Sequence, residues 1–301
     1  MLLVRFTPFC GLQPSLDDGC NPGFSETRMS AVFALLASLT YGVADFMGGV
    51  VGRRVSTFSL VFWSQLVGLA FGVVASLLFP ATAFEIRDLA WGAVAGTVGL
   101  VGILALYHGL AWGRMAVVSP LAGLISAVIP LGLGVALGER PQGLEWLGVA
   151  TALPAIWIVA AGAETEKGRG GVGMGLIAGV GFGLFFAALA QAGDGAGFWP
   201  LVASRTASVT LLAVVVAKRR EPVPATGSRL VISLVGIGEV LANVFLLLAY
   251  RSGLISLVSV LASLYPAITV LLAVSILKEP LARRQIIGVA LALVAVALIA
   301  L

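Results

Sequence analysis

Residues 116–137 read AVVSPLAGLISAVIPLGLGVAL and contain no charged side chain. At ~1.5 Å per residue, a helix of this length spans the ~30 Å hydrocarbon core of a bilayer. Pro120 and Pro130 each remove a backbone donor, so they are expected to free carbonyl groups and bend the helix. The stretch therefore predicts a transmembrane helix that is bent or broken at two prolines.

Runs of the same kind follow one another along nearly the whole chain. Of 301 residues, 59% are hydrophobic and 11% charged, and the mean hydropathy is +1.08. A water-soluble domain of this size does not have such a composition. We expect an all-α integral membrane protein with ten transmembrane helices. Their predicted ranges are 30–51, 58–80, 89–110, 116–137, 146–163, 172–192, 199–217, 230–250, 254–277 and 285–301.

The first 28 residues differ from the rest. They carry both cysteines, Cys10 and Cys20, and have no apolar run long enough to cross a membrane. We expect a polar, disordered tail, with Met29 as an alternative start. No apolar core follows Arg5, so no secretory signal is expected. Since both cysteines lie in this tail, neither a disulfide framework nor a metal site is expected.

The two halves of the chain resemble each other. Residues 35–42 (LLASLTYG) align with residues 176–183 (LIAGVGFG) at a shift of 141, which places Ser64 opposite Arg205. A shift of 140 aligns motifs farther along each half, including Gly138-Glu139 with Lys278-Glu279. The predicted domains are a tail at 1–28, a first repeat at 29–163, a linker at 164–171 and a second repeat at 172–301.

Each repeat has five predicted helices, which is an odd number. The second repeat would therefore enter the membrane from the opposite side, so the repeats would be inverted. Inverted repeats recur in secondary transporters, where two similar halves exchange conformations around a site between them. The sequence thus predicts two inverted five-helix repeats that operate by alternating access.

Short motifs recur at matching places in both halves. The first half contains YHGL at 107–110, AVVSPL at 116–121, LGER at 137–140 and WLG at 146–148. The second half contains LVSVLASLYP at 257–266, LKEP at 277–280 and IG at 287–288. Over about residues 30–301, these motifs resemble the EamA domain of the drug/metabolite transporter superfamily. Lys278 stands where the resemblance expects glycine in a Gly-Glu pair.

This resemblance implies a ten-helix carrier with a central cavity between the halves, most often an exporter of amino acids, metabolites or drugs. It also implies that both termini are cytoplasmic. The charge distribution points the other way. With alternating helix directions, twelve Lys and Arg residues lie on one side and five on the side of the termini, so the positive-inside rule places the termini outside. The orientation is left open.

Three charged residues fall inside predicted spans, namely Asp45, Arg205 and Glu239. A charge near mid-span costs ~2.5–3.5 kcal/mol on insertion scales, so such residues are expected to face a cavity or a partner. Asp45 and Glu239 are the candidate proton carriers, because burial disfavours the charged form of a carboxylate. For Asp45 the alternative is pairing with Arg53, Arg54 or another helix. Arg205 is more simply explained by a structural ion pair than by substrate binding.

Other polar residues of the spans share faces with these carboxylates. Tyr41 precedes Asp45 by one turn, and Asn243 follows Glu239 by one turn. With Gln65 and Tyr265 they are predicted to line the substrate cavity. In contrast, Tyr107 lies near a predicted helix end, where an interfacial aromatic belt explains most aromatic residues.

Prolines and glutamates mark corresponding places in helices 4 and 9. Pro120 and Pro130 in the first repeat and Pro266 in the second are candidate helix breaks, which are good pointers to a transport site. Glu139 and Glu279 each lie beside a basic residue, so a capping or gating ion pair is expected at both.

The expected function is a secondary transporter in the plasma membrane that exports small amphipathic metabolites, amino acids or drugs, with proton coupling as an option. Uptake of a sugar or nucleoside-like solute is the alternative. A membrane-embedded enzyme or a non-transporting scaffold represents a different class, although dispersed carboxylates and one histidine argue against an enzyme. No cofactor, metal or nucleic-acid partner is expected. A monomer would suffice, and a homodimer is compatible with the sequence.

Overall fold

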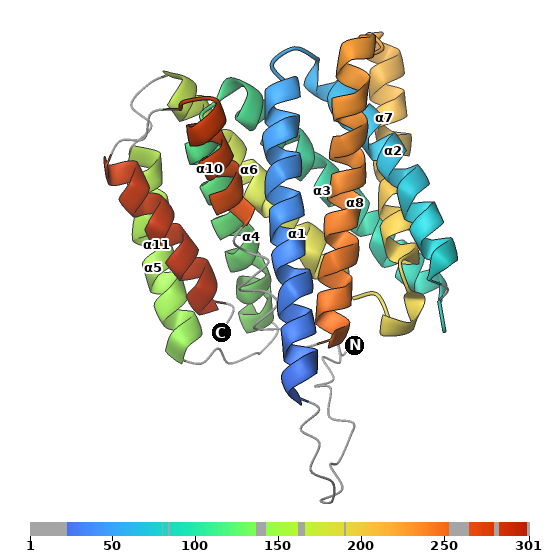
Figure 1. The fold of residues 1–301 in the computed structure, drawn as a ribbon, viewed down its shortest axis with the longest axis horizontal. Coiled ribbons are helices and arrows are strands. Elements are labelled where there is room, and N and C mark those ends of the chain that lie inside the picture. Colours follow the sequence, from blue (N-terminus) through green and yellow to red (C-terminus); the bar gives the residue numbers. More distant parts are fainter. Residues whose placement is uncertain are drawn as a thin grey trace, which may run out of the picture.

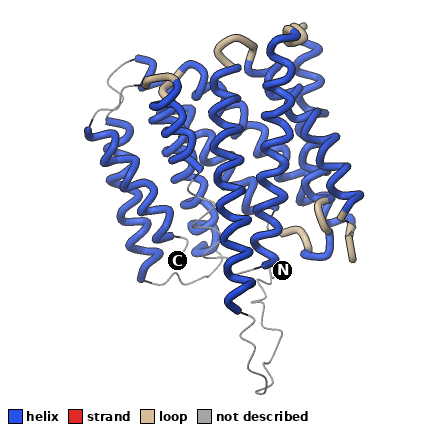
Figure 2. The backbone as a smooth tube through the Cα atoms, viewed as in Figure 1, coloured by secondary structure: helices blue, strands red, loops and turns tan. Residues whose placement is uncertain are grey.

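The structure is a computed structural model that describes residues 23–79, 81–83, 85–136, 143–161, 166–189, 191–252, 265–279 and 283–299. Within these ranges the regular elements are helices, without strands, joined by short loops (Figure 2). The helices are α1 (Gly23–Val51), α2 (Thr57–Leu78), α3 (Ile86–Trp112), α4 (Met115–Ala136), α5 (Gly143–Ala161), α6 (Glu166–Leu189), the 3-10 turn η1 (Asp194–Ala196), α7 (Trp199–Arg219), α8 (Thr226–Ser252), α10 (Tyr265–Ile276) and α11 (Arg283–Ile299).

Each of the ten predicted ranges overlaps one of these α-helices. Six of the described helices are long and apolar enough to cross a membrane, and shorter apolar helices occur in α4, α10 and α11. The count of ten crossings therefore stays a prediction. α1 and α6 begin earlier than predicted, at Gly23 and Glu166, because hydropathy does not detect a polar helical extension. The predicted ninth helix spans 254–277, and its first part, residues 254–264, lies outside the described residues.

The packing of the helices follows the internal repeat. When α1, α2, α3 and α4 are matched with α6, α7, α8 and α10, the main contacts between these helices of the two repeats occur in corresponding pairs. α1 packs on α8 as α6 packs on α3, and α2 packs on α8 as α7 packs on α3. In Figure 1, α1 and α8 lie side by side, α5 and α11 pair at one edge, and α2 and α7 lie at the other. The repeats therefore interlock rather than forming separate bundles.

Aligned glycines of α1 and α6 make close contacts with the corresponding helices α10 and α4. A Cβ added to Gly42 of α1 would lie 2.4 Å from Cβ of Ile268 in α10. Its aligned partner, Gly183 of α6, would meet Cβ of Ile129 in α4 at 2.5 Å. Small residues permit such close approach of helices in lipid. The alignment of residues 35–42 with 176–183 thus corresponds to matching places in the fold.

A second pair of glycine contacts sets the alignment of α2 with α7. A Cβ on Gly96 of α3 would lie 2.0 Å from the carbonyl oxygen of Ser204 in α7. A Cβ on Gly236 of α8 would lie 2.1 Å from the carbonyl oxygen of Ser64 in α2. Both glycines and both serines are related by a shift of 140.

This geometry corrects the predicted match between Ser64 and Arg205. Since Ser64 corresponds to Ser204, the residue equivalent to Arg205 is Gln65. The error arose because the shift of 141, valid for the preceding helix pair, was extended into α2 and α7. A one-residue change matters, because it rotates the expected side-chain direction by ~100° around a helix.

Candidate functional site

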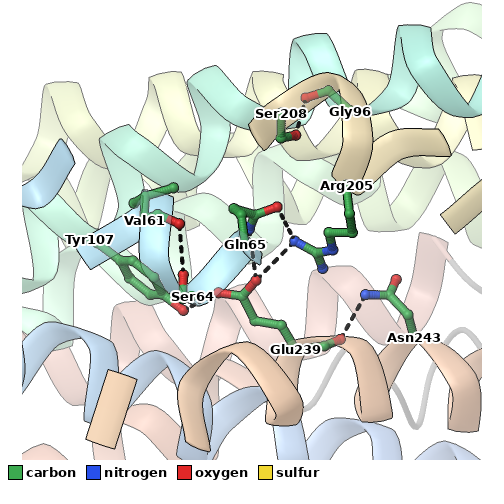
Figure 3. Close-up of polar contacts among 9 residues, drawn as sticks. All are labelled: Val61, Ser64, Gln65, Gly96, Tyr107, Arg205, Ser208, Glu239 and Asn243. Atoms are coloured by element: carbon green, nitrogen blue, oxygen red, sulfur yellow. Dashed lines mark hydrogen bonds and ion pairs between the residues drawn. The ribbon is translucent and has the colours of Figure 1, made fainter. Parts of the chain in front are cut away.

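A buried polar cluster lies where α2, α3, α7 and α8 meet (Figure 3). Its centre is the Glu239 carboxylate of α8, which is only 4% exposed. The Arg205 Nη1 atom of α7 lies 3.0 Å from Glu239 Oε2, and Gln65 Nε2 of α2 donates to the same oxygen at 3.1 Å. Tyr107 of α3 donates its hydroxyl proton to Glu239 Oε1. Four helices from both repeats are thereby joined through one carboxylate.

The cluster satisfies the ionised form of Glu239. The carboxylate accepts hydrogen bonds from three side chains, one of which carries a full positive charge. Arg205 Nη1 also donates to Gln65 Oε1 at 2.6 Å, so the amide and the guanidinium hold each other in place. Buried ion pairs persist only when their remaining hydrogen-bonding groups are also satisfied. Glu239 and Arg205 therefore form a structural pair, as expected for Arg205.

Close packing on α1 positions the Tyr107 ring. A Cβ at Gly48 would lie 2.5 Å from Cε1 of Tyr107, so only glycine leaves room for the ring there. Tyr107 is fully buried, and α3 continues five residues beyond it to Trp112. The prediction that Tyr107 belongs to an interfacial belt is therefore wrong. Trp112 and Trp146, by contrast, are more than half exposed.

Asp45 lies on α1 one turn before Gly48 and is 5% exposed. It is close enough to Glu239, Tyr107 and Tyr265 to interact electrostatically with each. Around this cluster the charged side chains are those of Asp45, Glu239 and Arg205. The other buried acid among the described residues, Asp88 at the start of α3, accepts hydrogen bonds from backbone amides. One carboxyl group is thus left without a counter-charge, since Arg205 contacts Glu239 directly.

A second polar group joins α1, α4 and α10 beside Asp45. The Tyr41 and Tyr265 rings lie 6.0 Å apart between centroids in a tilted arrangement. Tyr265 is hydrogen-bonded to Ser126 of α4, and the Thr269 hydroxyl donates to the Gly42 carbonyl at 3.2 Å. The structure thus brings together Tyr41, Asp45 and Tyr265, three of the predicted cavity residues from both repeats.

Asn243 is buried one turn beyond Glu239 in α8. Its Nδ2 atom donates to the Glu239 carbonyl at 2.7 Å, whereas its Oδ1 atom has no hydrogen-bond partner. The hydroxyl of Ser119 in α4 is likewise buried without a partner. An unpaired buried acceptor costs ~1–3 kcal/mol.

The prolines of α4 do not end the helix. α4 remains helical from Met115 to Ala136 through both Pro120 and Pro130, and Pro266 is the second residue of α10. A Cβ on Gly123 of α4 would lie 2.6 Å from Cγ of Pro266, so the proline-containing segments of the two repeats touch. Their part in gating stays a prediction.

Glu279 links the repeats at one end of the bundle. Its carboxylate accepts hydrogen bonds from the backbone amides of Met115 and Ala116, each at 3.3 Å, and lies 3.6 Å from Arg53 Nη2. Free amides at a helix N-terminus favour an anion there. Glu279 therefore caps α4 and pairs with Arg53, rather than with the adjacent Lys278 that suggested an ion pair in the sequence. Its counterpart Glu139 lies outside the described residues.

Comparison with known proteins identifies the family. The profile of the EamA-like transporter family matches the chain twice, at residues 28–161 and 169–301. The chain belongs to this family. It is accordingly a multi-pass membrane transporter of the drug/metabolite transporter superfamily with the two-repeat EamA architecture.

A solved crystal structure supports the fold of this EamA protein. The two align with a TM-score of 0.60 and 21% sequence identity, over 92% of this chain and 96% of the other. At that identity the likeness concerns the fold alone. The search of curated proteins gave no match.

Proposed function

We propose that this EamA-family transporter exports small amphipathic metabolites, amino acids or drugs by alternating access, and that it couples export to proton entry. The observation that supports this most strongly is the excess carboxyl group in the buried centre. Arg205 contacts Glu239, so Asp45 lacks an equivalent cation within the described bundle. A carboxylate without a counter-charge is costly in the membrane interior, and uptake of a proton removes that charge.

In this proposal the two carboxyl groups have different roles. Glu239 holds α2, α3, α7 and α8 together in its ionised form. Asp45 binds and releases the proton, because it lies outside the hydrogen-bonded cluster and within electrostatic reach of Glu239. Substrate would then contact the neighbouring polar groups Tyr41, Tyr265 and Asn243.

The interlocked packing supports alternating access. Corresponding helix pairs make close glycine contacts in both repeats, such as Gly42 with Ile268 and Gly183 with Ile129. Two arrangements in which the repeats exchange their contacts would therefore have similar packing energies, so a modest free-energy difference would select between them.

The first test identifies the cargo. Untargeted comparison of intracellular and extracellular small molecules would be made in cells that produce the wild type, Asp45→Asn, Glu239→Gln or the control Glu221→Gln at equal membrane abundance. We expect the same compounds to be enriched outside with the wild type and the control, and depleted there with both other variants. Accumulation inside the cells would support the uptake alternative, and no difference in either compartment would contradict transport of these solutes.

The second test addresses the proton. With an identified compound in reconstituted vesicles, Asp45→Asn should retain exchange of labelled for unlabelled substrate but lose its response to an imposed pH gradient. Glu239→Gln should impair both, because it disturbs the cluster. If Asp45→Asn still responds to the gradient like the wild type, Asp45 is not the coupling residue.

A further inference from the structure

A strongly basic corner lies at the junction of α7 with α8. Lys218, Arg219, Arg220 and Arg229 are all exposed there, and Glu221 is the acidic residue in the same loop. Lys218 and Arg219 form the last turn of α7, where the candidate span Trp199–Arg219 ends. Four cations against one carboxylate leave this corner with a large positive charge at the end of a membrane-crossing helix.

This corner makes contacts with α2 and within its own loop. The Arg219 guanidinium carbon lies 4.5 Å from the centroid of the Phe58 ring, a cation–π contact. The Ser59 hydroxyl donates to the Pro222 carbonyl at 2.8 Å, and Arg229 Nε donates to the Pro224 carbonyl at 3.0 Å. The backbone of the basic loop is therefore fixed against α2, with the Lys218 and Arg220 side chains exposed.

An apolar stripe lies directly below the basic residues. Leu211 and Val214 of α7 are 44% and 52% exposed. Together with Lys218 they follow an i, i+3, i+7 spacing, which places all three on one face of the helix. An exposed apolar face that ends in a cation matches the layout of a phospholipid, with its acyl chains in hydrocarbon and its phosphate at the membrane surface.

We infer that this corner is a binding site for an anionic phospholipid. Lys218 and Arg220 would contact the headgroup phosphate, while an acyl chain lies along Leu211 and Val214. The apolar stripe distinguishes this ligand from free phosphate, which would use the cations alone. The inference does not depend on the transported substrate or on proton coupling.

Native mass spectrometry of the full-length protein in detergent tests this inference. Phosphatidylglycerol and phosphatidylcholine with identical acyl chains would be titrated against the wild type, Lys218→Gln/Arg220→Gln and the control Arg283→Gln/Arg284→Gln, which loses the same charge on α11. We expect phosphatidylglycerol to bind the first double variant about 30-fold more weakly, which corresponds to ~1 kcal/mol for each basic residue. The control should lose less than about 3-fold.

Further measurements distinguish binding of a phospholipid from binding of a simple anion. Val214→Asn should weaken phosphatidylglycerol binding but leave the binding of glycerol phosphate unchanged. Equal losses of phosphatidylglycerol binding in both double variants would overturn the inference and indicate that overall charge drives binding. Equal affinity for phosphatidylcholine would also overturn it, because the headgroup charge would then not matter. Displacement of the lipid by an equal concentration of inorganic phosphate would show a simple anion site instead. Thermal unfolding of every variant verifies folding, and Lys218→Arg/Arg220→Lys should bind like the wild type.

Discussion

The two repeats are alike where their backbones meet and unlike in the side chains they bring to the centre. Gly96 against Ser204 and Gly236 against Ser64 are near-identical contacts, one from each repeat. Between them, the equivalent residues Gln65 and Arg205 face each other and form a hydrogen bond of 2.6 Å. Equivalent positions that contact each other lie on the pseudo-two-fold axis between the repeats.

This position explains why the repeats differ there. Identical residues on a two-fold axis meet their own copies, so two arginines would bring like charges together in a low-dielectric interior. One guanidinium and one amide avoid this repulsion, and the amide can both donate to Glu239 and accept from Arg205. The backbone symmetry suits exchange between two states, whereas the side-chain asymmetry confines the charges to one cluster.

The largest effect is expected when the two equivalent positions on the pseudo-two-fold axis carry the same residue. Arg205→Gln would place glutamine at both equivalent positions and leave Glu239 buried without its cation. Loss of one partner of a buried ion pair typically costs ~3–5 kcal/mol. We expect a comparable loss in the free energy of unfolding, measured by denaturant titration in detergent. Arg205→Gln combined with Glu239→Gln should recover part of this loss, and failure of Arg205→Gln to destabilise the protein would contradict a structural ion pair.

Removal of the Tyr107 hydroxyl should give the next largest loss of stability. In the second repeat the equivalent residue is Leu247, which donates no hydrogen bond. Tyr107→Phe removes a donor to a charged acceptor, which corresponds to ~1.5–3 kcal/mol. Thermal unfolding should show this loss, and Arg205→Gln/Tyr107→Phe should deviate from additivity because both side chains bind one carboxylate. Strict additivity of the two changes would argue against a shared cluster.

Paired glycine substitutions test whether the backbones are equivalent. Gly96→Ala and Gly236→Ala each place a methyl group against a carbonyl oxygen, so each should lower stability by ~1–3 kcal/mol through overpacking. The two losses should agree with each other in unfolding experiments. Gly173→Ala is the control, since a Cβ there meets nothing within 4 Å. A large effect in only one of the two repeats would show that the contacts are not equivalent.

The smallest predicted effect lies at the end of α10. Lys278 has a φ of 56°, in the left-handed region that glycine adopts at little cost, and its counterpart in the first repeat is Gly138. Lys278→Gly should therefore raise stability by about 1 kcal/mol, measured as a higher unfolding temperature. Lys278→Val should lower it, and a destabilising Lys278→Gly would indicate that the lysine side chain contributes more than its backbone conformation costs.

Much of the site was accessible from the sequence. Asp45, Glu239 and Arg205 were identified because charges are rare and costly inside apolar spans. Asn243 was placed beside Glu239 by helical spacing, and Gln65 was predicted as a cavity residue without a partner. Tyr107 was missed because its distance from the predicted helix end was taken as a measure of depth in the membrane. Its place in the YHGL motif was the available signal, but a motif does not state which side chain it contacts.

The sequence alone determined that the chain forms apolar helices in two related sets, because lipid as a solvent imposes a composition that can be recognised segment by segment. It also determined which polar residues needed a partner. Only the tertiary structure decided that Gln65, Tyr107, Arg205 and Glu239 meet. Contacts between helices depend on their rotation and crossing, and a shift of one residue rotates a side chain by ~100°. That dependence is also why the match of Arg205 with Ser64 failed, although the all-helical character of the chain was predicted.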